Sequence, residues 1–272
     1  MTPSPEQGLP MAAPELFRIG PLIVTNSMVV TWIVAAALIA AAQFVCRNAK
    51  AVPTAGQIFA EWIVESLLNF LGDILGTHLA RQTFWFLGTL FIFILSLNWF
   101  GLLPGVGTIG YGVGEHWWHL EVTRPFLRGA NADLNLPAAM AILFFFLWLY
   151  WSIRANGPIG FVKHIFGSKA DFGGFVGLIM AVVFIAVGFL EVISIGIRPV
   201  ALTFRLYGNV YGGEVMLDAM MRLVPSLSWL IPLPFYFYEL LVGLVQALVF
   251  CLLCAVFTAM MCRHDEHEET GH

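Results

Sequence analysis

The residues best able to do chemistry in this sequence are charged side chains inside long apolar segments. Glu191, Arg198 and Arg205 recur at intervals of seven residues, which brings them close to one face of a helix, two turns apart. Asn209 continues this face. A charge inside a spanning helix costs about 2.5 to 3.5 kcal/mol on insertion scales, and such residues usually face a bundle interior or a water-filled cavity. We therefore interpret these residues as a polar stripe that faces a partner.

A second polar stripe lies on the last apolar segment. Glu239, Gly243 and Gln246 share one helical face there, at spacings of four and three. In the segment of the first stripe, Gly208 and Gly212 have the spacing of small residues that lets another helix approach closely. Two apolar helices with matching polar stripes indicate an aqueous or proton-conducting seam between them.

Several polar or reactive residues also allow a structural interpretation. Glu191 and Arg198 could form a buried ion pair, and for these two residues both interpretations stay open. Cys251 and Cys254 have the spacing of a redox or metal motif, but no His lies near them on this apolar segment, so we interpret them as packing residues. Interfacial Trp anchors and a solvated tail explain two His-containing groups better than metal binding does. These groups are residues 115–119 in a loop, and His264, His267 and His272 at the end. We expect no metal or cofactor.

The composition requires a membrane environment. The sequence is 59% hydrophobic and 11% charged, and its mean hydropathy is +0.84, whereas a soluble domain carries roughly 25% charged residues. Several stretches without Asp, Glu, Lys or Arg are about as long as the ~20 residues that a helix needs to cross a bilayer. Residues 1–17 lack a basic region, so we do not expect a secretory signal. The net charge of -4 says little about partners, and we expect membrane lipid but no nucleic acid among them.

The apolar pattern predicts an all-α, polytopic protein with a single membrane domain over residues 1–272. We expect about five transmembrane helices, plus one amphipathic helix in the membrane interface where polar residues recur at every fourth position. The segment 172–224 would be ~75 Å long as one helix, far more than a ~30 Å hydrocarbon core. It must turn back, or be tilted and kinked near Pro199. The predicted parts are an N-terminal tail over 1–23, spans over 24–46, 83–103 and 136–154, the amphipathic helix over 54–80, the long kinked helix over 172–224, the last helix over 232–262 and a polar tail over 263–272.

Basic residues between the spans predict the orientation. The loops after the first and third spans carry Arg47, Lys50, Arg81, Arg154, Lys163 and Lys169. Arg124 and Arg128, in the opposite loop, weaken this signal. Under the positive-inside rule we expect the N-terminus outside and the C-terminus in the cytoplasm.

The run from Arg198 to Glu214, RPVALTFRLYGNVYGGE, resembles the signature of subunit a of the F-type ATP synthase. The resemblance extends over most of the chain. It includes the amphipathic helix, residues 98–105 at the end of the second span, residues 132–135 before the third, and residues 239–246. Members of that family have a perpendicular helix, a surface helix, a transmembrane hairpin and a final pair of long tilted helices. The resemblance therefore favours a tilted, bent helix over 172–224.

The resemblance also implies a role for each polar residue. Arg205 matches the family's essential arginine, which faces the ion-binding carboxylate of the rotating c-ring. The other matches are Glu214 and Glu239 in the periplasmic half-channel, Asn209 and Gln246 near the arginine, Glu191 near the other half-channel, Arg198 at the basic start of the signature and Asp133 at the outer mouth. A guanidinium cannot give up its proton, so an arginine between two half-channels blocks a direct leak. The expected function is that of a non-catalytic stator channel.

The same resemblance implies the setting. We expect a multi-pass protein of a bacterial plasma membrane, with c-ring subunits and peripheral-stalk b subunits as partners and the F1 sector as an indirect one. The alternatives are a stand-alone secondary ion transporter, whose internal repeats are not found here, and an intramembrane enzyme, whose nucleophile or metal triad is not found either. Whether the coupling ion is H⁺ or Na⁺ stays open.

Overall fold

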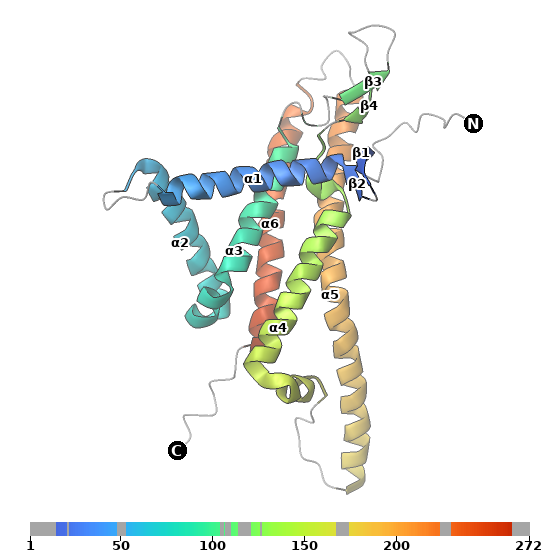
Figure 1. Ribbon diagram of the computed structural model, residues 1–272. Helices are drawn as coiled ribbons and strands as arrows, with labels where there is room; N and C mark the ends of the chain where they lie inside the picture. Colours follow the sequence, from blue (N-terminus) through green and yellow to red (C-terminus); the bar gives the residue numbers. More distant parts are fainter. Residues whose placement is uncertain are drawn as a thin grey trace, which may run out of the picture.

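The computed structural model describes residues 15–20, 22–47, 53–103, 106, 110–113, 121–125, 127–166, 174–223 and 230–262 (Figure 1). The predicted helical, polytopic fold is confirmed. Within the described part of the chain, five helices are long and apolar enough to cross a membrane: α1, α3, α4, α5 and α6. The helices are α1 (Asn26–Arg47), α2 (Ala55–Leu75), α3 (Thr77–Gly101), the 3-10 turn η1 (Ala130–Ala132), α4 (Asn135–Phe166), α5 (Gly174–Leu223) and α6 (Leu233–Cys262).

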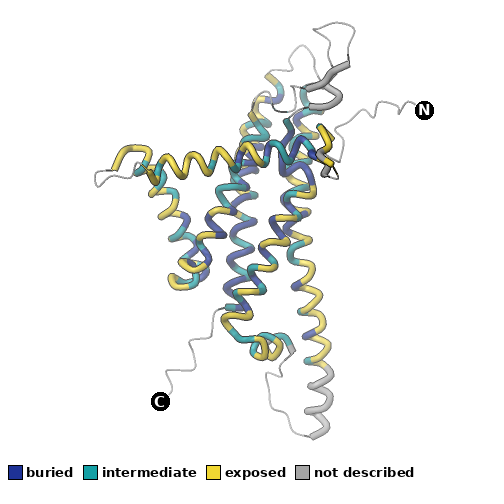
Figure 2. The backbone as a smooth tube through the Cα atoms, in the orientation of Figure 1, coloured by how far each residue is buried: buried dark blue, intermediate teal, exposed yellow. Residues whose placement is uncertain are grey.

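Helices α3, α4, α5 and α6 form the bundle, and α1 lies across it near one end (Figure 1). At the crossing, Val30 and Val34 of α1 pack on Leu97 of α3 and on Ala130 of η1. The rest of α1 extends away from the bundle and is mostly exposed (Figure 2). One helix therefore lies across the others and contacts them only near its own N-terminal end.

Helix α2 returns from α1 to the bundle and packs against α3 and α6. It buries one face, on which Leu67, Leu71 and Leu75 recur at every fourth position. The opposite side carries exposed Phe59 and Trp62 among polar residues. The helix is amphipathic because its apolar residues follow the 3.6-residue period of one face.

Side-chain hydrogen bonds fix α6 at the centre of the bundle. The indole Nε1 of Trp148 on α4 donates to the carbonyl of Phe257 at 3.0 Å, and Asn156 Nδ2 donates to the carbonyl of Met261 at 2.6 Å. Helix α4 then bends sharply at Gly157, whose φ of 70° is left-handed, before Pro158. That conformation favours glycine because it has no Cβ. The bend lets the end of α4 turn across the bundle (Figure 1).

Helix α5 runs from Gly174 to Leu223 as one helix of 50 residues, through Pro199. The segment therefore does not turn back on itself. Near its middle, Leu202 and Leu206 are fully buried against the bundle. Much of the lower half of α5 is exposed in Figure 2. Because this exposed surface is apolar, it must contact lipid or another protein.

Two short hairpins differ from the predicted all-helical pattern. Strand β1 (Glu15–Ile19) pairs antiparallel with β2 (Leu22–Thr25), within the segment expected to be a tail, and β3 (Gly110–Val113) pairs antiparallel with β4 (Glu121–Pro125). Strands this short give little signal in a periodicity search, because four or five residues fit either period. Both hairpins lie near the end of the bundle that α1 crosses (Figure 1).

Candidate functional site

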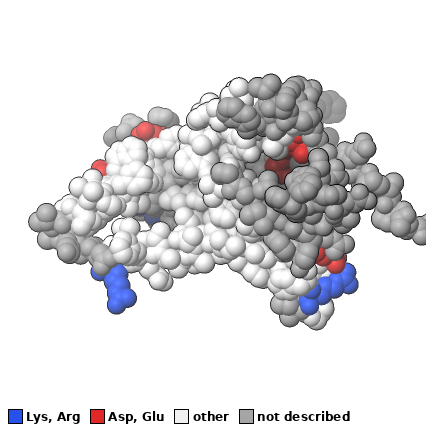
Figure 3. Space-filling view, turned by 90° about the horizontal axis from the view of Figure 1, so that it is seen from above, with Lys and Arg blue, Asp and Glu red and all other residues white. Residues whose placement is uncertain are grey.

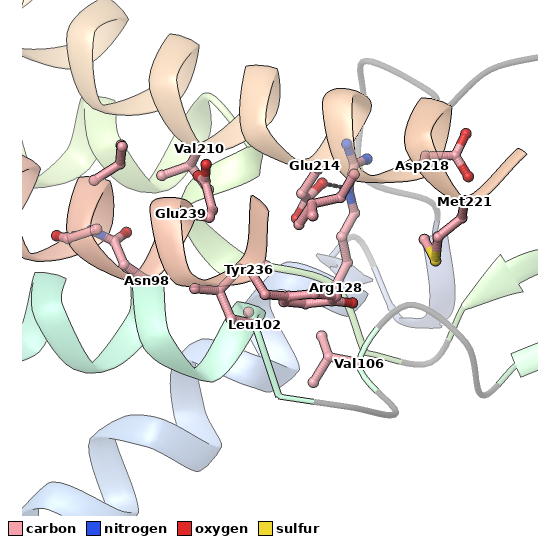
Figure 4. Close-up of a pocket in the computed structure, with 15 residues that line it drawn as sticks. Asn98, Leu102, Val106, Arg128, Val210, Glu214, Asp218, Met221, Tyr236 and Glu239 are labelled. Carbon is pink, nitrogen blue, oxygen red and sulfur yellow. Dashed lines mark hydrogen bonds and ion pairs between the residues drawn. The ribbon is translucent and has the colours of Figure 1, made fainter. Parts of the chain in front are cut away.

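A cavity of about 190 Å³ lies between α3, α5 and α6, beside the loop before η1, with charged side chains in a largely apolar wall (Figure 4). Its polar lining comes from four parts of the chain: Asn98 on α3, Arg128 in the loop, Glu214 and Asp218 on α5, and Glu239 on α6. Seen from above, acidic atoms lie right of the centre of this face and also toward its upper left and lower right edges, while most of the visible Lys and Arg atoms lie at the lower edges (Figure 3). One water needs only about 10–15 Å³ of such volume. The cavity can therefore hold several waters beside carboxyl groups.

Glu214 forms an ion pair with Arg128 at one side of this cavity. The Nε of Arg128 donates to Glu214 Oε2 at 3.2 Å, and the arginine side chain is only 3% exposed. The backbone of Gly129 also hydrogen-bonds the Glu214 carboxylate. The guanidinium lies 5.8 Å from the ring centroid of Tyr211, which stacks on Tyr207. Charge, hydrogen bond and ring together hold the Arg128 side chain against α5.

Glu239 reaches the same cavity from α6, and its carboxylate lies against the backbone of Gly213 on α5. A Cβ placed on Gly213 would overlap all three atoms of that carboxyl group. The residue is 9% exposed, and among the described residues it has no hydrogen bond or ion pair. Figure 4 shows Glu239 between Asn98 and Glu214. Glycine at position 213 is thus what allows a carboxyl group between two closely packed helices.

Asn98 joins α3 to α6 at the wall of the cavity. Its Nδ2 donates to the carbonyl of Gly243 at 2.9 Å, and its Oδ1 accepts from Asn131 Nδ2 at 2.7 Å. One residue further on, Trp99 Nε1 donates to the carbonyl of Leu240 at 3.2 Å. These bonds fix the turn of α6 that carries Glu239. Gly243 allows the close approach, because a Cβ there would come to 3.1 Å from the Cβ of Asn98.

A second cavity, of about 380 Å³, lies toward the N-terminal half of α5 and is lined by Ser194, Arg198, Arg205 and Phe257 among others. The Nη2 of Arg198 donates to Glu191 Oε1 at 3.0 Å, and its guanidinium lies 4.7 Å from the ring centroid of Phe257 on α6. The ion pair that the sequence allowed is therefore present. It occupies the wall of a cavity that also contains Arg205.

Arg205 is exposed and is the last residue along α5 that lines the second cavity, five positions before Val210, where the α5 lining of the first cavity begins. Seven residues at about 100° each return nearly to the same face, so Arg198 and Arg205 share one cavity. Nine residues make two and a half turns, so Glu214 lies on the opposite side of α5. Within the described residues, Arg205 has no ion pair or hydrogen bond. A permanent cation therefore lies on the side of α5 opposite Glu214, without a bonded carboxylate among the described residues.

The structure separates the two polar stripes more than the sequence indicated. Asn209 is exposed like Arg205, and Gly208 and Gly212 have no atom within 4 Å of an added Cβ. At the first cavity, the face of α5 toward α6 carries Val210, Gly213 and Glu214 instead of Asn209. Arg198 and Arg205 of the predicted stripe line the second cavity together with Phe257 of α6. The proton-conducting seam stays a prediction. Gln246 is half-buried on α6 and lines neither cavity.

Asp133, expected at the outer mouth, is buried in the connection between η1 and α4. Its Oδ2 accepts from Ser27 Oγ of α1 at 2.6 Å, and its Oδ1 accepts from the backbone N and the Nδ2 of Asn135 at 3.2 and 3.0 Å. It lines neither cavity. These contacts cap the start of α4 and join it to α1.

Residues 28–259 match the family described as ATP synthase A chain. The chain belongs to this family. It is 31% identical over 251 residues to "ATP synthase subunit a 2" of a Bradyrhizobium strain, covering 92% of this chain and 95% of the relative. It is also similar to "ATP synthase subunit a" of Moorella thermoacetica (29% identical, covering 90% and 94%) and of Gloeobacter violaceus (30%, covering 92% and 90%).

Membership in the ATP synthase A chain family makes this chain a non-catalytic, proton-translocating membrane subunit of an ATP synthase. The sequence alone did not indicate that Arg128 belongs to the site, because it showed this residue only as a positive charge in a loop. It also did not indicate the chemical role of Asn98. A polar residue inside an apolar span was the signal that could have found Asn98, whereas Arg128 lies outside any periodic pattern.

The remaining metal and redox alternatives gain no support. Cys251 and Cys254 are buried, and the Sγ of Cys251 donates to the carbonyl of Leu87 at 3.4 Å, as expected for packing residues. No group of three possible metal ligands occurs in the part of the chain that the structure describes. The loop 115–119 and His264, His267 and His272 lie outside the described residues.

Proposed function

We propose that Arg205 is the gate between two half-channels of this F0 stator subunit. One half-channel contains the cavity of Glu214 and Glu239, and the other contains the cavity of Arg198 and its partner Glu191. The observation that carries the proposal is the position of Arg205. It is exposed in the wall of the second cavity, at the end nearer the first cavity along α5, and has no ion pair or hydrogen bond among the described residues. A guanidinium keeps its proton, so protons cannot pass directly from one cavity to the other.

The counter-ion of Arg205 is a carboxylate on a rotating ring of c subunits. Gly208 and Gly212 leave open space beside Arg205, and Asn209 is exposed on the same part of α5. Small residues let a neighbouring helix approach closely in a membrane. A carboxylate that arrives here loses its proton more readily, because a nearby opposite charge favours the ionised form. Besides Asn209, Gln246 on α6 supplies a second side-chain amide near Arg205 in this proposal.

Proton transfer then follows a fixed order. A proton enters the first cavity, crosses it and neutralises a ring carboxylate. That site leaves by rotation, and after nearly a full turn it releases its proton into the second cavity. The membrane potential supplies about 2.3 kcal/mol per charge for each 100 mV. Asp133 supports the first cavity from outside, through its contacts with α1 and α4.

The chain belongs to an ATP synthase complex, and its helices and its bacterial relatives indicate a plasma membrane. We also propose that peripheral-stalk b subunits are neighbours of this chain and that the F1 sector is an indirect partner. In the same proposal, the N-terminus lies outside and the C-terminus lies in the cytoplasm. The basic residues of the loops after the first and third spans support this orientation.

The proposal predicts that Arg205→Lys abolishes ATP-driven proton pumping. Lys keeps the positive charge, but its compact ammonium does not reproduce the fork of a guanidinium. The measurement is acidification of inverted membrane vesicles, with the amount of this chain in the purified complex as a check on assembly. Arg47→Lys, at the exposed end of α1, is the matched control and is expected to pump normally.

Arg205→Ala tests the gate itself. Without the guanidinium, vesicles energised by another pump are expected to lose their proton gradient faster. An unchanged decay rate would contradict the gate, and normal pumping by Arg205→Lys would contradict the whole assignment. Co-purification is a separate check, because a stand-alone transporter would be active without ring and stalk subunits.

A further inference from the structure

The structure contains a buried ion pair at the cavity that the proposed proton path does not yet explain. We propose that Arg128 is a positioning residue that fixes Glu214 as its counter-ion on the cavity wall, and that Glu239 is the carboxyl group that exchanges protons with the cavity water. This inference rests on the proposed function and assigns different roles to Glu214 and Glu239, the two carboxyl groups of the first half-channel.

The contacts of Glu214 support its role as a fixed counter-ion. Its Oε2 accepts from Arg128 Nε at 3.2 Å, and its carboxylate also bonds the backbone of Gly129. Gly129 is so close that a Cβ there would overlap the Glu214 carboxylate. The arginine is held in turn by burial and by the Tyr211 ring. An ion pair requires the ionised carboxylate, so a proton arriving on Glu214 would first have to break these contacts.

Glu239 has the opposite surroundings. Among the described residues no donor or cation is bonded to it, and it lines the same cavity as Arg128 and Asn98. Its carboxylate lies against Gly213, and the charged group that acts on it is the Glu214 carboxyl rather than a cation. A proton that binds to Glu239 or leaves it breaks no ion pair among the described residues, so it leaves no buried cation without its counter-ion. Of the two glutamates, Glu239 is therefore the one that can exchange a proton without breaking an ion pair.

Four charged residues line the cavity. Glu214 of α5 faces Arg128 of the loop and Glu239 of α6, and Asp218 lies one turn further along α5. Tyr236 of α6 lies beside Arg128 in Figure 4. Arg128 is thus the cation of the described lining, set against three acidic residues. Its charge is balanced while Glu214 is ionised, whatever the state of Glu239.

The test compares single and double neutral substitutions in the assembled complex. Glu214→Gln removes the carboxylate that forms the ion pair with the buried guanidinium of Arg128 and leaves one more net positive charge at the proposed proton entrance, so pumping is expected to fall at least tenfold. Arg128→Gln with Glu214→Gln removes both charges together. Pumping by this double variant is expected to recover at least tenfold over Glu214→Gln alone, at the same pH midpoint as the unchanged protein. Arg128→Lys keeps the charge and is expected to retain most of the activity.

The readouts are ATP-driven acidification of inverted vesicles across pH and the amount of chain in the purified complex. If Glu214→Gln alone does not assemble, the double variant is still expected to assemble, since it buries no unpaired charge. A double variant that is no better than Glu214→Gln in pumping or in assembly would overturn the inference, because Glu214 would then be needed as a proton carrier. Glu239→Gln is expected to be inactive in every background, and pumping that persists in it would also overturn the inference. Arg205→Lys, measured in the same vesicles, reports separately on the proposed function.

Discussion

Gly213 offers a direct test of how the proton-accepting carboxyl group is held. Its Cα lies against the Glu239 carboxylate, so Gly213→Ala would place a methyl group where that carboxylate now lies. Overpacking in a core usually costs about 1–3 kcal/mol. Here the colliding atoms are the end of a flexible side chain, which can move away, and alanine improves helix propensity by about 1 kcal/mol. The two effects nearly cancel, and we expect normal assembly.

The effect on pumping is expected to be much larger. The carboxylate must shift by an ångström or more, and a misplacement of about 1 Å in a reacting group can cost ~100-fold in rate. We therefore expect at least a tenfold slower ATP-driven acidification of inverted vesicles, normalised to the amount of complex. Gly72→Ala on α2 is the matched control, since no atom lies within 4 Å of a Cβ there. It gains the same helix propensity and is expected to pump normally.

A second substitution separates position from simple damage to the helix. Glu239→Asp shortens the side chain by one methylene group and moves the carboxylate back from position 213. In the Gly213→Ala background we expect it to restore part of the pumping. If Gly213→Ala alone pumps like the unchanged protein at normal assembly, the close contact between α5 and Glu239 does not position the proton carrier, and the reasoning is refuted.

Two further predictions concern the residues that support the cavity. Asn98→Leu removes the bonds to a carbonyl of α6 and to Asn131, and leaves Asn131 without this partner, so we expect a loss of about 2–4 kcal/mol in stability, measured as thermal dissociation of the complex. Asp133→Ala removes the acceptor for Ser27 and Asn135 and is expected to cost a similar ~2–4 kcal/mol, with unchanged pumping per assembled complex. Reduced pumping per complex in Asp133→Ala would show that Asp133 takes part in proton transfer. An unchanged dissociation temperature in Asn98→Leu would show that the α3–α6 bonds contribute little.

Residue type and spacing predicted much of the helical architecture and the polar residues that lie on regular helices. Charges inside apolar segments are rare because they are costly, and this is why Arg205, Glu214 and Glu239 were found without a structure. Spacing alone could not tell which side of α5 faces α6. Nine residues, or two and a half helical turns, separate Arg205 from Glu214, so the two side chains lie on opposite sides of α5. Glu214 therefore lines the first cavity, and Arg205 is exposed on the other side of the helix.

The contacts of the connecting loop could not be predicted from the sequence. Arg128 pairs with a residue 86 positions away, and its segment has no helical or strand period that would place its side chain. The same holds for Asp133, whose partner Ser27 lies on α1, 106 positions earlier. A positive charge in such a loop gives a topology signal, and only the folded chain shows that it is a buried partner of Glu214.

The length of α5 has a consequence for the membrane potential. The part of α5 whose side chains the structure describes, Val183–Met221, has 39 apolar-rich residues and is ~58 Å long. To stay within a ~30 Å hydrocarbon core it must lean by about 60° from the membrane normal. Arg198 and Glu214, which mark the two cavities, are then separated by ~24 Å along the helix, of which only ~12 Å is depth and ~20 Å is lateral. Movement parallel to the membrane plane crosses no transmembrane voltage, so most of the distance between the two cavities is travelled without work against the electric field.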